Sequence, residues 1–337
     1  MQRRMMTKIA VLGAGAWGTA FAQVLADAGN QVVMWDIDPD VVDEINSQHS
    51  NTRRLPNVKR LPDDIIAESD RAGAVSGAEI VVVAIAAQHA CEALTQFKGL
   101  LGHDAIAVSL MKGIERGTDR RMDQVVCQTL DLDPVRFAAV SGPNLSKEVA
   151  AREPSATVVA SADADTAMKV ARACTTDYFK AFVSDDVIGL EMCGSLKNVT
   201  ALAVGMSRGA GFGENTAAMI QARGLAELTA LGEACGAKSK TFAGLAGVGD
   251  LVATCGSSLS RNYTFGFNLG QGKSIEEATR VSKGVAEGVP TTDAVVALGK
   301  RYQVATPLAT AMSHVLDQGL SCRGMIDELF GGQITAE

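Results

Sequence analysis

The chain has 337 residues, of which 47% are hydrophobic but only 4% are aromatic, and its formal net charge is −7. This length exceeds that of one typical domain and therefore predicts two domains. The negative charge gives no general support for binding to nucleic acids or to an anionic membrane, so an anionic ligand would need a local positive pocket.

The cysteines and the N-terminal segment indicate a cytoplasmic protein. Seven cysteines are scattered along the chain without a C-x-x-C pair, a pattern typical of free thiols in a reducing compartment and not of a disulfide framework or a zinc site. The first apolar run, Ile9–Leu12, is too short for a signal peptide. We therefore expect neither a metal site nor a secretory signal.

The first predicted elements are a strand, a glycine-rich turn and a helix. The strand Ile9–Leu12 leads into a G-x-G-x-x-G turn, and an amphipathic pattern follows over residues 19–28. This order predicts a dinucleotide-binding fingerprint. Gly13 permits the tight turn, Gly15 lets a pyrophosphate approach the backbone, and Gly18 lets the helix pack closely on the strand. A glycine-rich turn that holds no ligand is the plain alternative.

The first half of the chain alternates predicted strands with predicted helices. The further strands are Gln31–Trp35, Ile80–Ile85, Ala105–Ser109, Phe137–Ser141, Thr157–Ala160 and Ala181–Val183. The helices are Pro39–Gln48 with Asp38 as its cap, His89–Phe97, Asp119–Leu130, a short helix from Asn144, and Asp163–Cys174, while residues 50–62 form a polar loop. This alternation predicts parallel βαβ units in a doubly wound α/β sheet.

The pattern changes after Asp186, which is a good N-cap for a long helix. Val187–Ser207 is predicted as that helix, and because it contains charged residues such as Lys197 we expect it to be buried in protein and not to span a membrane. Further helices are expected near residues 215–235, 245–253, 265–271, 292–302, 308–317 and 325–330, with no strand signal after Val183. The sequence thus predicts a dinucleotide-binding domain over residues 1–186 and an all-α domain over residues 187–337.

A dinucleotide domain joined to a helical domain favours hydride transfer, which requires a group that handles a proton. None of the four histidines lies in a glycine-rich or charged turn, and none of the three tyrosines is followed four residues later by a lysine. The cysteines and histidines form no zinc-binding cluster. Lysine therefore remains as the candidate.

Two lysines stand out by their surroundings. Lys112 follows the strand that ends at Ser109, which places it at the carboxyl edge of the sheet, where ligands bind. Lys197 lies within an apolar helix, where burial is unfavourable without a partner; a lysine whose amine extends to solvent is the alternative. Asp250 and Thr254 share one helix face. Asp250 is thus a candidate partner for Lys197, although it can instead cap a helix.

A third cluster consists of Ser260, Arg261 and Asn262. A hydroxyl, a guanidinium and an amide side by side can together hold a phosphate or a planar anion. The plain alternative for such a tripeptide is a solvated turn.

A series of motifs occurs in one order along the chain: GAGAWGTA, MKGIERGT, SGPNLSKEV, GSLKNVTALAVGM, GENTAAMIQARGL, LAGVGDLVATC, SRNYTFG and AEG. In this combination the chain resembles bacterial NAD(P)-dependent glycerol-3-phosphate dehydrogenases over almost its whole length. The resemblance implies a Rossmann-type N-terminal domain and a cytoplasmic homodimer. It also implies reversible reduction of dihydroxyacetone phosphate to sn-glycerol 3-phosphate, which feeds glycerophospholipid synthesis.

The resemblance also implies roles for single residues. Lys197 would be the general acid/base, with Lys112 and Asp250 beside it. The substrate contacts would be Lys112, Gly142, Asn144, Lys197, Asp250, Ser260, Arg261 and Asn262. The cofactor contacts, with the fingerprint and the end of the second strand included, would be Gly13, Gly15, Ala16, Trp17, Gly18, Asp36, Lys112, Ser146, Arg261, Val285 and Glu287.

The choice of cofactor depends on the end of the second strand. Asp36 can accept hydrogen bonds from a free ribose 2′-hydroxyl and would repel a 2′-phosphate. A relative that prefers NADP would carry histidine or arginine near Ile37. Arg53 and Arg54 in the polar loop would compensate if they folded over the adenosine. We therefore expect the enzyme to use NAD(H) or NADP(H), with a preference for NAD(H).

Two other classes remain as alternatives. A β-hydroxyacid dehydrogenase of the 6-phosphogluconate or hydroxyisobutyrate kind also has a Rossmann domain, a helical domain and a helix-borne lysine. The GDLVATC and SRN segments instead favour a ketone that bears a phosphate. A non-catalytic NAD-binding sensor would have no reason to keep Lys112, Lys197, Asp250 and Arg261 together.

Overall fold

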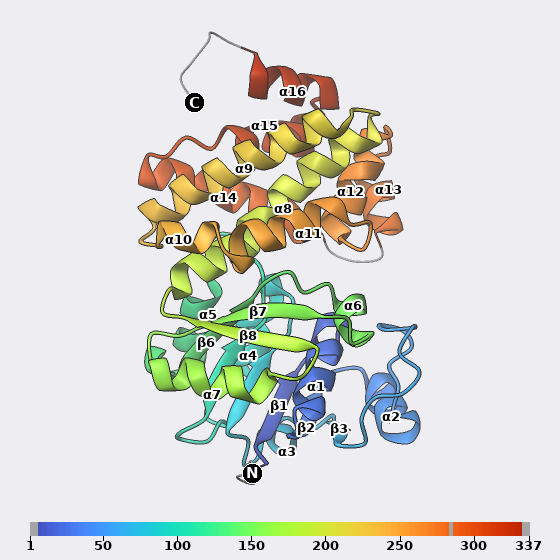
Figure 1. Ribbon diagram of the computed structural model, residues 1–337, viewed down its shortest axis with the longest axis vertical. Coiled ribbons are helices and arrows are strands. Elements are labelled where there is room, and N and C mark those ends of the chain that lie inside the picture. The colour runs from blue at the N-terminus through green and yellow to red at the C-terminus, as the bar shows by residue number, and fades with distance from the viewer. Residues whose placement is uncertain (1–5, 283–285, 332–337) are drawn as a thin grey trace. The chain divides into compact units, whose positions relative to one another are not determined.

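The computed structural model describes residues 6–282 and 286–331, which fall into two compact units (Figure 1). Unit 1 comprises Met1–Lys112 and Arg120–Glu191, and unit 2 comprises Gly113–Asp119 and Met192–Glu337. The chain therefore contributes a short segment to unit 2 before it completes unit 1.

Unit 1 contains one eight-stranded sheet with the strand order β3-β2-β1-β4-β5-β6-β7-β8. The strands are β1 Lys8–Leu12, β2 Gln31–Trp35, β3 Ile65–Glu68, β4 Ile80–Val83, β5 Ile106–Ser109, β6 Phe137–Ser141, β7 Ser155–Ala160 and β8 Phe179–Ser184. Neighbouring strands run parallel except for β6 and β7, which are antiparallel. Strand β1 lies inside the sheet, where Val11 pairs with Met34 of β2 on one side and with Val82 of β4 on the other.

Seven α-helices connect these strands. They are α1 Ala16–Asp27, α2 Pro39–Gln48, α3 Arg71–Val75, α4 Ala90–Thr95, α5 Met122–Leu130, α6 Ser146–Ala150 and α7 Ala164–Cys174. The core consists mainly of small and branched apolar side chains from the strands and from the helices packed on them. It contains few aromatic rings; two of them, Phe21 and Phe179, have centroids 6.2 Å apart. Strands buried on both faces explain why their sequences are continuous apolar runs.

The predicted doubly wound parallel sheet is confirmed, with one exception at β7, which runs antiparallel to β6. The segment between these strands contains only the five-residue helix α6. Such a helix rises about 8 Å, whereas a five-residue strand such as β6 spans about 17 Å. The helix therefore does not carry the chain back to the start of β6, and β7 returns in the opposite direction. Strand β3 was not expected at all, because its four residues follow a long polar loop.

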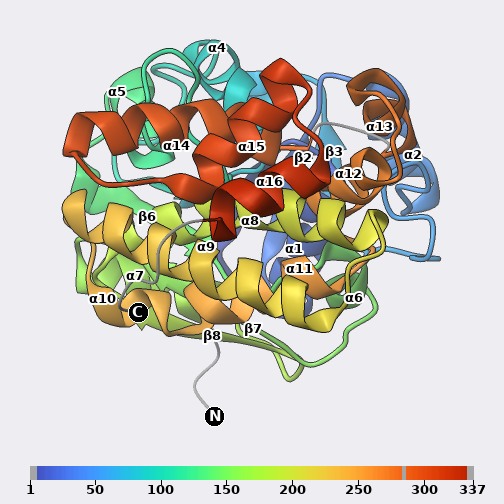
Figure 2. The same ribbon diagram turned by 90° about the horizontal axis from the view of Figure 1, so that it is seen from above.

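Unit 2 is helical, and no strand follows β8 in the part of the chain that the structure describes. Its helices are α8 Val187–Gly209, which begins in unit 1, α9 Glu214–Ala234, α10 Ser239–Phe242, α11 Asp250–Gly256, α12 Arg261–Gly270, α13 Ile275–Val281, α14 Gly288–Tyr302, α15 Pro307–Gln318 and α16 Cys322–Phe330. Helix α9 packs against α10, α11, α14 and α15. Helix α14 also packs against α15, and α15 packs against α16 (Figure 2). A single π-helical turn, Leu245–Gly249, leads into α11 and divides the helix expected over residues 245–253.

Helix α8 is long and apolar enough to cross a bilayer by length and composition, but 89% of its apolar window is buried inside the protein. It packs closely on α12 through glycines of both helices. A Cβ atom on Gly205 would overlap the backbone of Tyr263, and one on Gly266 would overlap the backbone of Leu202. These contacts fix α8 along the neighbouring helix, as expected for a core helix.

The division between the units falls inside α8, between Glu191 and Met192, and not at residue 186, where the sequence pattern changes. The first residues of α8 are bonded to unit 1, since the Asp123 backbone N–H donates to Glu191 Oε2 at 3.2 Å. Burial, followed by the nearby charge of Asp123, raises the pKa of Glu191 well above its usual value. The start of the helix therefore belongs physically to the α/β unit.

Candidate functional site

The glycine turn has two glycines that the protein's own packing requires. Gly13 has a φ of +106°, and a Cβ atom there would lie 2.8 Å from the carbonyl oxygen of Ala84. A Cβ atom on Gly18 would overlap the carbonyl oxygen of Gly13. Both positions therefore need glycine for the turn and for close packing of α1 on β1.

Gly15 is different, because a Cβ atom there would meet no protein atom within 4 Å. Gly15 precedes the first turn of α1, and no side chain caps that helix. The open space thus lies beside backbone N–H groups and the positive end of the helix dipole, which is the arrangement that binds a pyrophosphate. The residues present fit a dinucleotide cofactor.

Asp36 lies at the carboxyl end of β2, directly beside this turn. Its Oδ2 accepts a hydrogen bond from the Ala14 N–H at 2.7 Å, and its Oδ1 accepts one from the Asp38 N–H at 3.0 Å. The next side chain, Ile37, is 77% exposed. A carboxylate has further lone pairs, so Asp36 can also accept from ribose hydroxyls.

The other predicted cofactor contacts are distributed over both units. Ala16 and Trp17 lie in the first turn of α1, where the Trp17 ring packs against Phe21 with the centroids 5.5 Å apart. The indole of Trp17 therefore serves the core, and the backbone amides are what this turn can offer a phosphate. Ser146 is the first residue of α6, and Glu287 directly precedes α14. Val285 lies outside the described residues.

Lys112, Gly142 and Asn144 meet at the carboxyl edge of the sheet. Lys112 Nζ donates to the carbonyl oxygen of Gly142 at 3.1 Å. Asn144 Nδ2 donates to the carbonyl oxygen of Ala156 at 2.9 Å, and its Oδ1 accepts from Thr157 Oγ1 at 2.9 Å. The amide of Asn144 thus holds the turn after β6 against β7, while Lys112 places a positive charge beside that turn.

Ser141 is a polar residue at this edge that sequence reasoning missed. It ends β6 and is 4% exposed, and its Oγ has no hydrogen-bond partner among the residues that the structure describes. A serine at the carboxyl end of an otherwise apolar strand was the available signal, because ligands bind at that edge of a parallel sheet.

Lys197 and Asp250 form a buried ion pair within unit 2. Lys197 is 5% exposed and Asp250 2% exposed, and Lys197 Nζ lies 2.5 Å from Asp250 Oδ1. Lys197 Nζ also donates to Thr254 Oγ1 at 2.7 Å, and Thr254 Oγ1 donates to Asp250 Oδ1 at 3.3 Å. The amine of Lys197 therefore does not extend to solvent, and the Asp250 side chain faces it, while Gly249 occupies the N-cap position of α11.

Both residues of this pair are buried, which strengthens the electrostatic attraction between them. Burial raises the pKa of the adjacent Cys255 thiol to about 12, so this group stays neutral. The Asp250 carboxylate stabilises the ammonium form of Lys197, and the Thr254 hydroxyl fixes the position of Nζ. A buried amine held in this way can exchange a proton with a substrate oxygen.

The Ser260–Asn262 cluster lies at the start of α12. Ser260 Oγ caps this helix by accepting from the Tyr263 N–H at 3.2 Å, and the Arg261 side chain is exposed. The cluster therefore combines a helix N-terminus with an exposed guanidinium, both of which attract anions.

Asn262 links α12 to the start of α14. It is 8% exposed, and its Oδ1 accepts from the Gly288 N–H at 2.9 Å. A Cβ atom on Gly288 would lie 2.7 Å from the carbonyl oxygen of Asn198, the residue after Lys197. The structure thus brings Asn262, the start of α14 and the α8 backbone beside Lys197 together, a set of contacts that the sequence did not predict.

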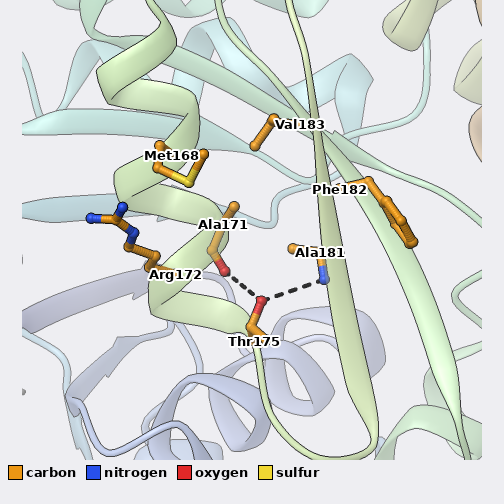
Figure 3. A pocket seen from close by; sticks show the side chains of 7 residues that line it. All are labelled: Met168, Ala171, Arg172, Thr175, Ala181, Phe182 and Val183. Atoms are coloured by element: carbon orange, nitrogen blue, oxygen red, sulfur yellow. Dashed lines mark hydrogen bonds between the residues drawn. The ribbon is translucent and has the colours of Figure 1, made fainter.

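A cavity of about 490 Å³ lies elsewhere, between α7 and β8 (Figure 3). It is lined by Met168, Ala171, Arg172, Thr175, Ala181, Phe182 and Val183. Thr175 Oγ1 donates to the carbonyl oxygen of Ala171 at 2.8 Å and accepts from the Ala181 N–H at 3.4 Å. The cavity contains none of the predicted site residues. Within residues 6–282 and 286–331, no group of three or more His, Cys, Asp or Glu residues is arranged to hold a metal ion.

Comparison with known proteins identifies the family. Residues 8–167 match the family described as NAD-dependent glycerol-3-phosphate dehydrogenase N-terminus, and residues 186–327 match its C-terminus. A protein of Bifidobacterium longum strain DJO10A is 68% identical over 333 residues, which cover 99% of this chain and 100% of the relative. A protein of Frankia casuarinae is 48% identical over 315 residues, 94% of each chain. Both are named as glycerol-3-phosphate dehydrogenases that use NAD(P)+.

Comparison with solved structures identifies the same family. A crystal structure of glycerol-3-phosphate dehydrogenase from Coxiella burnetii superposes with a TM-score of 0.92 at 35% sequence identity, covering 98% of this chain and 100% of that one. These matches confirm the resemblance that the motifs indicated. The chain belongs to the NAD-dependent glycerol-3-phosphate dehydrogenase family and is an NAD(P)-dependent oxidoreductase that acts on CH–OH groups.

Proposed function

We propose that this enzyme reversibly reduces dihydroxyacetone phosphate to sn-glycerol 3-phosphate, with Lys197 as the general acid/base. The observation that carries the proposal is the buried amine of Lys197, 2.5 Å from Asp250 and 2.7 Å from the Thr254 hydroxyl. Apolar side chains of similar size at these positions would avoid the desolvation of two charges, so the fold alone does not require this pair, and a chemical role accounts for it.

The chemistry follows from the charge that develops during reduction. The nicotinamide, when bound, supplies a hydride to the ketone carbon. Negative charge then develops on the former carbonyl oxygen, and Lys197 donates a proton to it; in the reverse direction Lys197 accepts that proton. Asp250 keeps the amine charged before the transfer, and Thr254 holds its position.

The phosphate of the substrate provides binding energy remote from the reacting carbon. We assign its recognition to the exposed guanidinium of Arg261 together with Ser260 and Asn262 at the start of α12, and to Lys112. Because the phosphate does not react, these contacts can orient the carbonyl for both the hydride and the proton. Gly142 and Asn144 complete the proposed contacts on the α/β unit.

For the cofactor we propose a preference for NAD(H). Gly15, Ala16 and Trp17 contribute backbone amides toward the pyrophosphate, while Asp36 accepts from the ribose hydroxyls. The support is the carboxylate that the Ala14 and Asp38 N–H groups hold at the end of β2. A clear advantage of NADPH over NADH in kcat/KM would refute this preference.

The test is oxidation of NADH on addition of dihydroxyacetone phosphate, followed by its loss of absorbance. Lys197→Ala is expected to remove most of kcat while NADH binding, measured by calorimetry, persists. Lys300→Ala, an exposed lysine on α14, is the matched control and is expected to keep normal turnover. Near-normal turnover by Lys197→Ala would contradict the role of this residue. Reduction of NAD+ or NADP+ by β-hydroxyacids, without oxidation of NADH by dihydroxyacetone phosphate, would favour the β-hydroxyacid alternative.

We also propose that the enzyme is a cytoplasmic homodimer whose product enters glycerophospholipid synthesis. The seven free cysteines are consistent with a reducing compartment. Light scattering of the purified enzyme measures the oligomeric state, and a monomer at working concentration would contradict the dimer.

A further inference from the structure

The polar loop after α2 is anchored to the glycine turn by a buried residue. Asn51 is 1% exposed, and its Nδ2 donates to the carbonyl oxygen of Ala14 and to Thr19 Oγ1, each at 2.9 Å. Thr52 is held as well, because its N–H donates to Glu44 Oε1 at 2.6 Å. The next residues of the loop therefore occupy a defined position beside the cofactor-binding turn.

Arg53 directly follows the anchored residues Asn51 and Thr52 in this loop. Its Nη1 lies 3.1 Å from Asp38 Oδ2, with Arg53 67% and Asp38 30% exposed. The Asp38 N–H in turn donates to Asp36 Oδ1. The guanidinium of Arg53 is thus held on Asp38. Asp38 is bonded to Asp36, the residue that contacts the ribose in the proposed function.

This arrangement sets up a competition between two anions. A guanidinium binds a carboxylate or a phosphate in the same forked geometry, and an arginine near this position is what accommodates the 2′-phosphate of NADP in dinucleotide-binding folds. Arg53 cannot offer the same donors to Asp38 and to a phosphate at once. Because its ion pair with Asp38 is exposed, the pair is weak enough to exchange.

We propose that Asp38 is a specificity-determining residue, which disfavours NADP(H) by withholding Arg53 from the 2′-phosphate. The inference rests on the proposed function, since it takes Asp36 as the residue that reads the ribose. Asp36 repels the 2′-phosphate directly, whereas Asp38 acts indirectly, by pairing with the arginine that would otherwise bind this phosphate. NADP(H) is then used when Arg53 turns from Asp38 to the phosphate.

Asp38→Asn isolates this role. Asp38 is the N-cap of α2, where its Oδ1 accepts from the Asp40 N–H at 3.1 Å. Asparagine caps helices as well as aspartate, so the variant keeps the helix start and removes only the charge that holds Arg53. Asp63→Asn is the matched control, because it removes the acid of another exposed pair of the same loop region, Arg60–Asp63 at 2.6 Å.

The experiment compares kcat/KM for NADPH and NADH in wild type, Asp38→Asn, Arg53→Ala and the double variant. Asp38→Asn is expected to raise the NADPH/NADH ratio roughly two- to fivefold, the range that an exposed ion pair supports. Arg53→Ala is expected to lower the ratio, and in its background Asp38→Asn should give no gain. Asp63→Asn should leave the ratio unchanged.

Two results would overturn the inference. One is an equal gain from Asp38→Asn with and without Arg53, which would make Asp38 a simple repulsive charge. The other is a ratio that Arg53→Ala leaves unchanged. Affinities of NADP+ and NAD+, measured by calorimetry on the same variants, test the inference without turnover. Failure of the wild type to reduce dihydroxyacetone phosphate would instead count against the proposed function.

Discussion

The ion pair between Lys197 and Asp250 can be tested by removing one charge at a time. Asp250→Asn preserves the size of the side chain and its ability to accept from Thr254 Oγ1, while it removes the negative charge 2.5 Å from Lys197 Nζ. The amine, on a side chain 7% exposed, would then lack its carboxylate. The perturbation therefore separates charge from packing.

The expected size of the effect follows from this burial. Removing one partner of a buried ion pair costs about 3–5 kcal/mol of unfolding free energy, because the remaining charge stays desolvated. The loss of a positioned general acid/base lowers the rate by about 10²–10⁴-fold. Asp250→Asn should approach the lower part of that range, since Lys197 is retained but its charge and position are no longer fixed.

Urea denaturation and steady-state kinetics measure the two quantities on the same preparations. Lys197→Met/Asp250→Asn removes both charges and is expected to recover part of the stability that Asp250→Asn loses, although it should be inactive. Asp327→Asn, which breaks the exposed Arg323–Asp327 pair on α16, is the control and should change stability by less than about 0.5 kcal/mol.

The outcome that would refute this reasoning is specific. If Asp250→Asn lost less than about 1 kcal/mol and kept its kcat, the pair would be neither electrostatically important nor part of proton transfer. If the double variant were no more stable than Asp250→Asn, the loss would come from packing and not from the uncompensated charge of Lys197.

Three further predictions concern a buried acid and two glycines of the glycine turn. Burial raises the pKa of Glu227 to about 7, although the Leu308 and Ala309 N–H groups bond to its carboxylate. Because the pKa is raised in the folded state, the contribution of Glu227 to stability is complete below about pH 4.5 and is lost as the pH rises through about 7. The loss is on the order of 3 kcal/mol. The melting temperature should therefore fall between about pH 5 and about pH 8 by more in wild type than in Glu227→Gln, and equal falls would contradict the assignment. Gly18→Ala should destabilise the protein by about 1–3 kcal/mol, because its Cβ overlaps a backbone carbonyl of the turn. Gly15→Ala should keep the melting temperature but weaken NADH binding at least about tenfold; unchanged affinity would mean that this space holds no cofactor.

Local signals account for the parts of the fold that the sequence predicted well. Helix α2 begins and ends where expected, because Asp38 caps it and Pro39 occupies its first turn. Strands β2 and β6 have the predicted bounds, since each is a continuous apolar run between polar turns. Such features depend on residues that are neighbours in the sequence, and the physical rules for caps and buried strands apply to them directly.

These local signals do not predict which strands pair or in which direction they run. The antiparallel pairing of β6 with β7 depends on where the chain goes after β6, which no periodicity encodes. Helix α13 was missed because it is short and has few apolar residues, and strand β3 was missed because its four residues follow a long polar loop. The π-helical turn before α11 is held by a hydrogen bond from the Gly249 N–H to the Gly244 carbonyl oxygen at 3.1 Å, within a stretch whose composition is also compatible with a regular helix.

The candidate site likewise has contacts that the sequence predicted and contacts that it did not. Lys197 and Asp250 were identified as partners because an apolar helix makes a lone lysine unfavourable and so calls for a counter-ion. The hydrogen bond between Asn262 and Gly288, by contrast, joins helices whose order in space is set by glycine contacts along α8. A sequence reveals which residue needs a partner more readily than which backbone atom will supply one.

The cofactor-binding turn shows why recognition and choice of cofactor require different evidence. Three glycines in a fixed spacing indicate a pyrophosphate site, because each meets a local steric demand. The choice that we propose between NAD(H) and NADP(H) instead rests on charges from separate segments, with Asp36 and Asp38 after β2 and Arg53 on a loop that Asn51 ties to the turn. The sequence identifies Asp36 and Arg53 as candidates for this choice, but it does not reveal that Arg53 pairs with Asp38. Their effect on a phosphate depends on which ion pair forms, and this is a property of the folded loop.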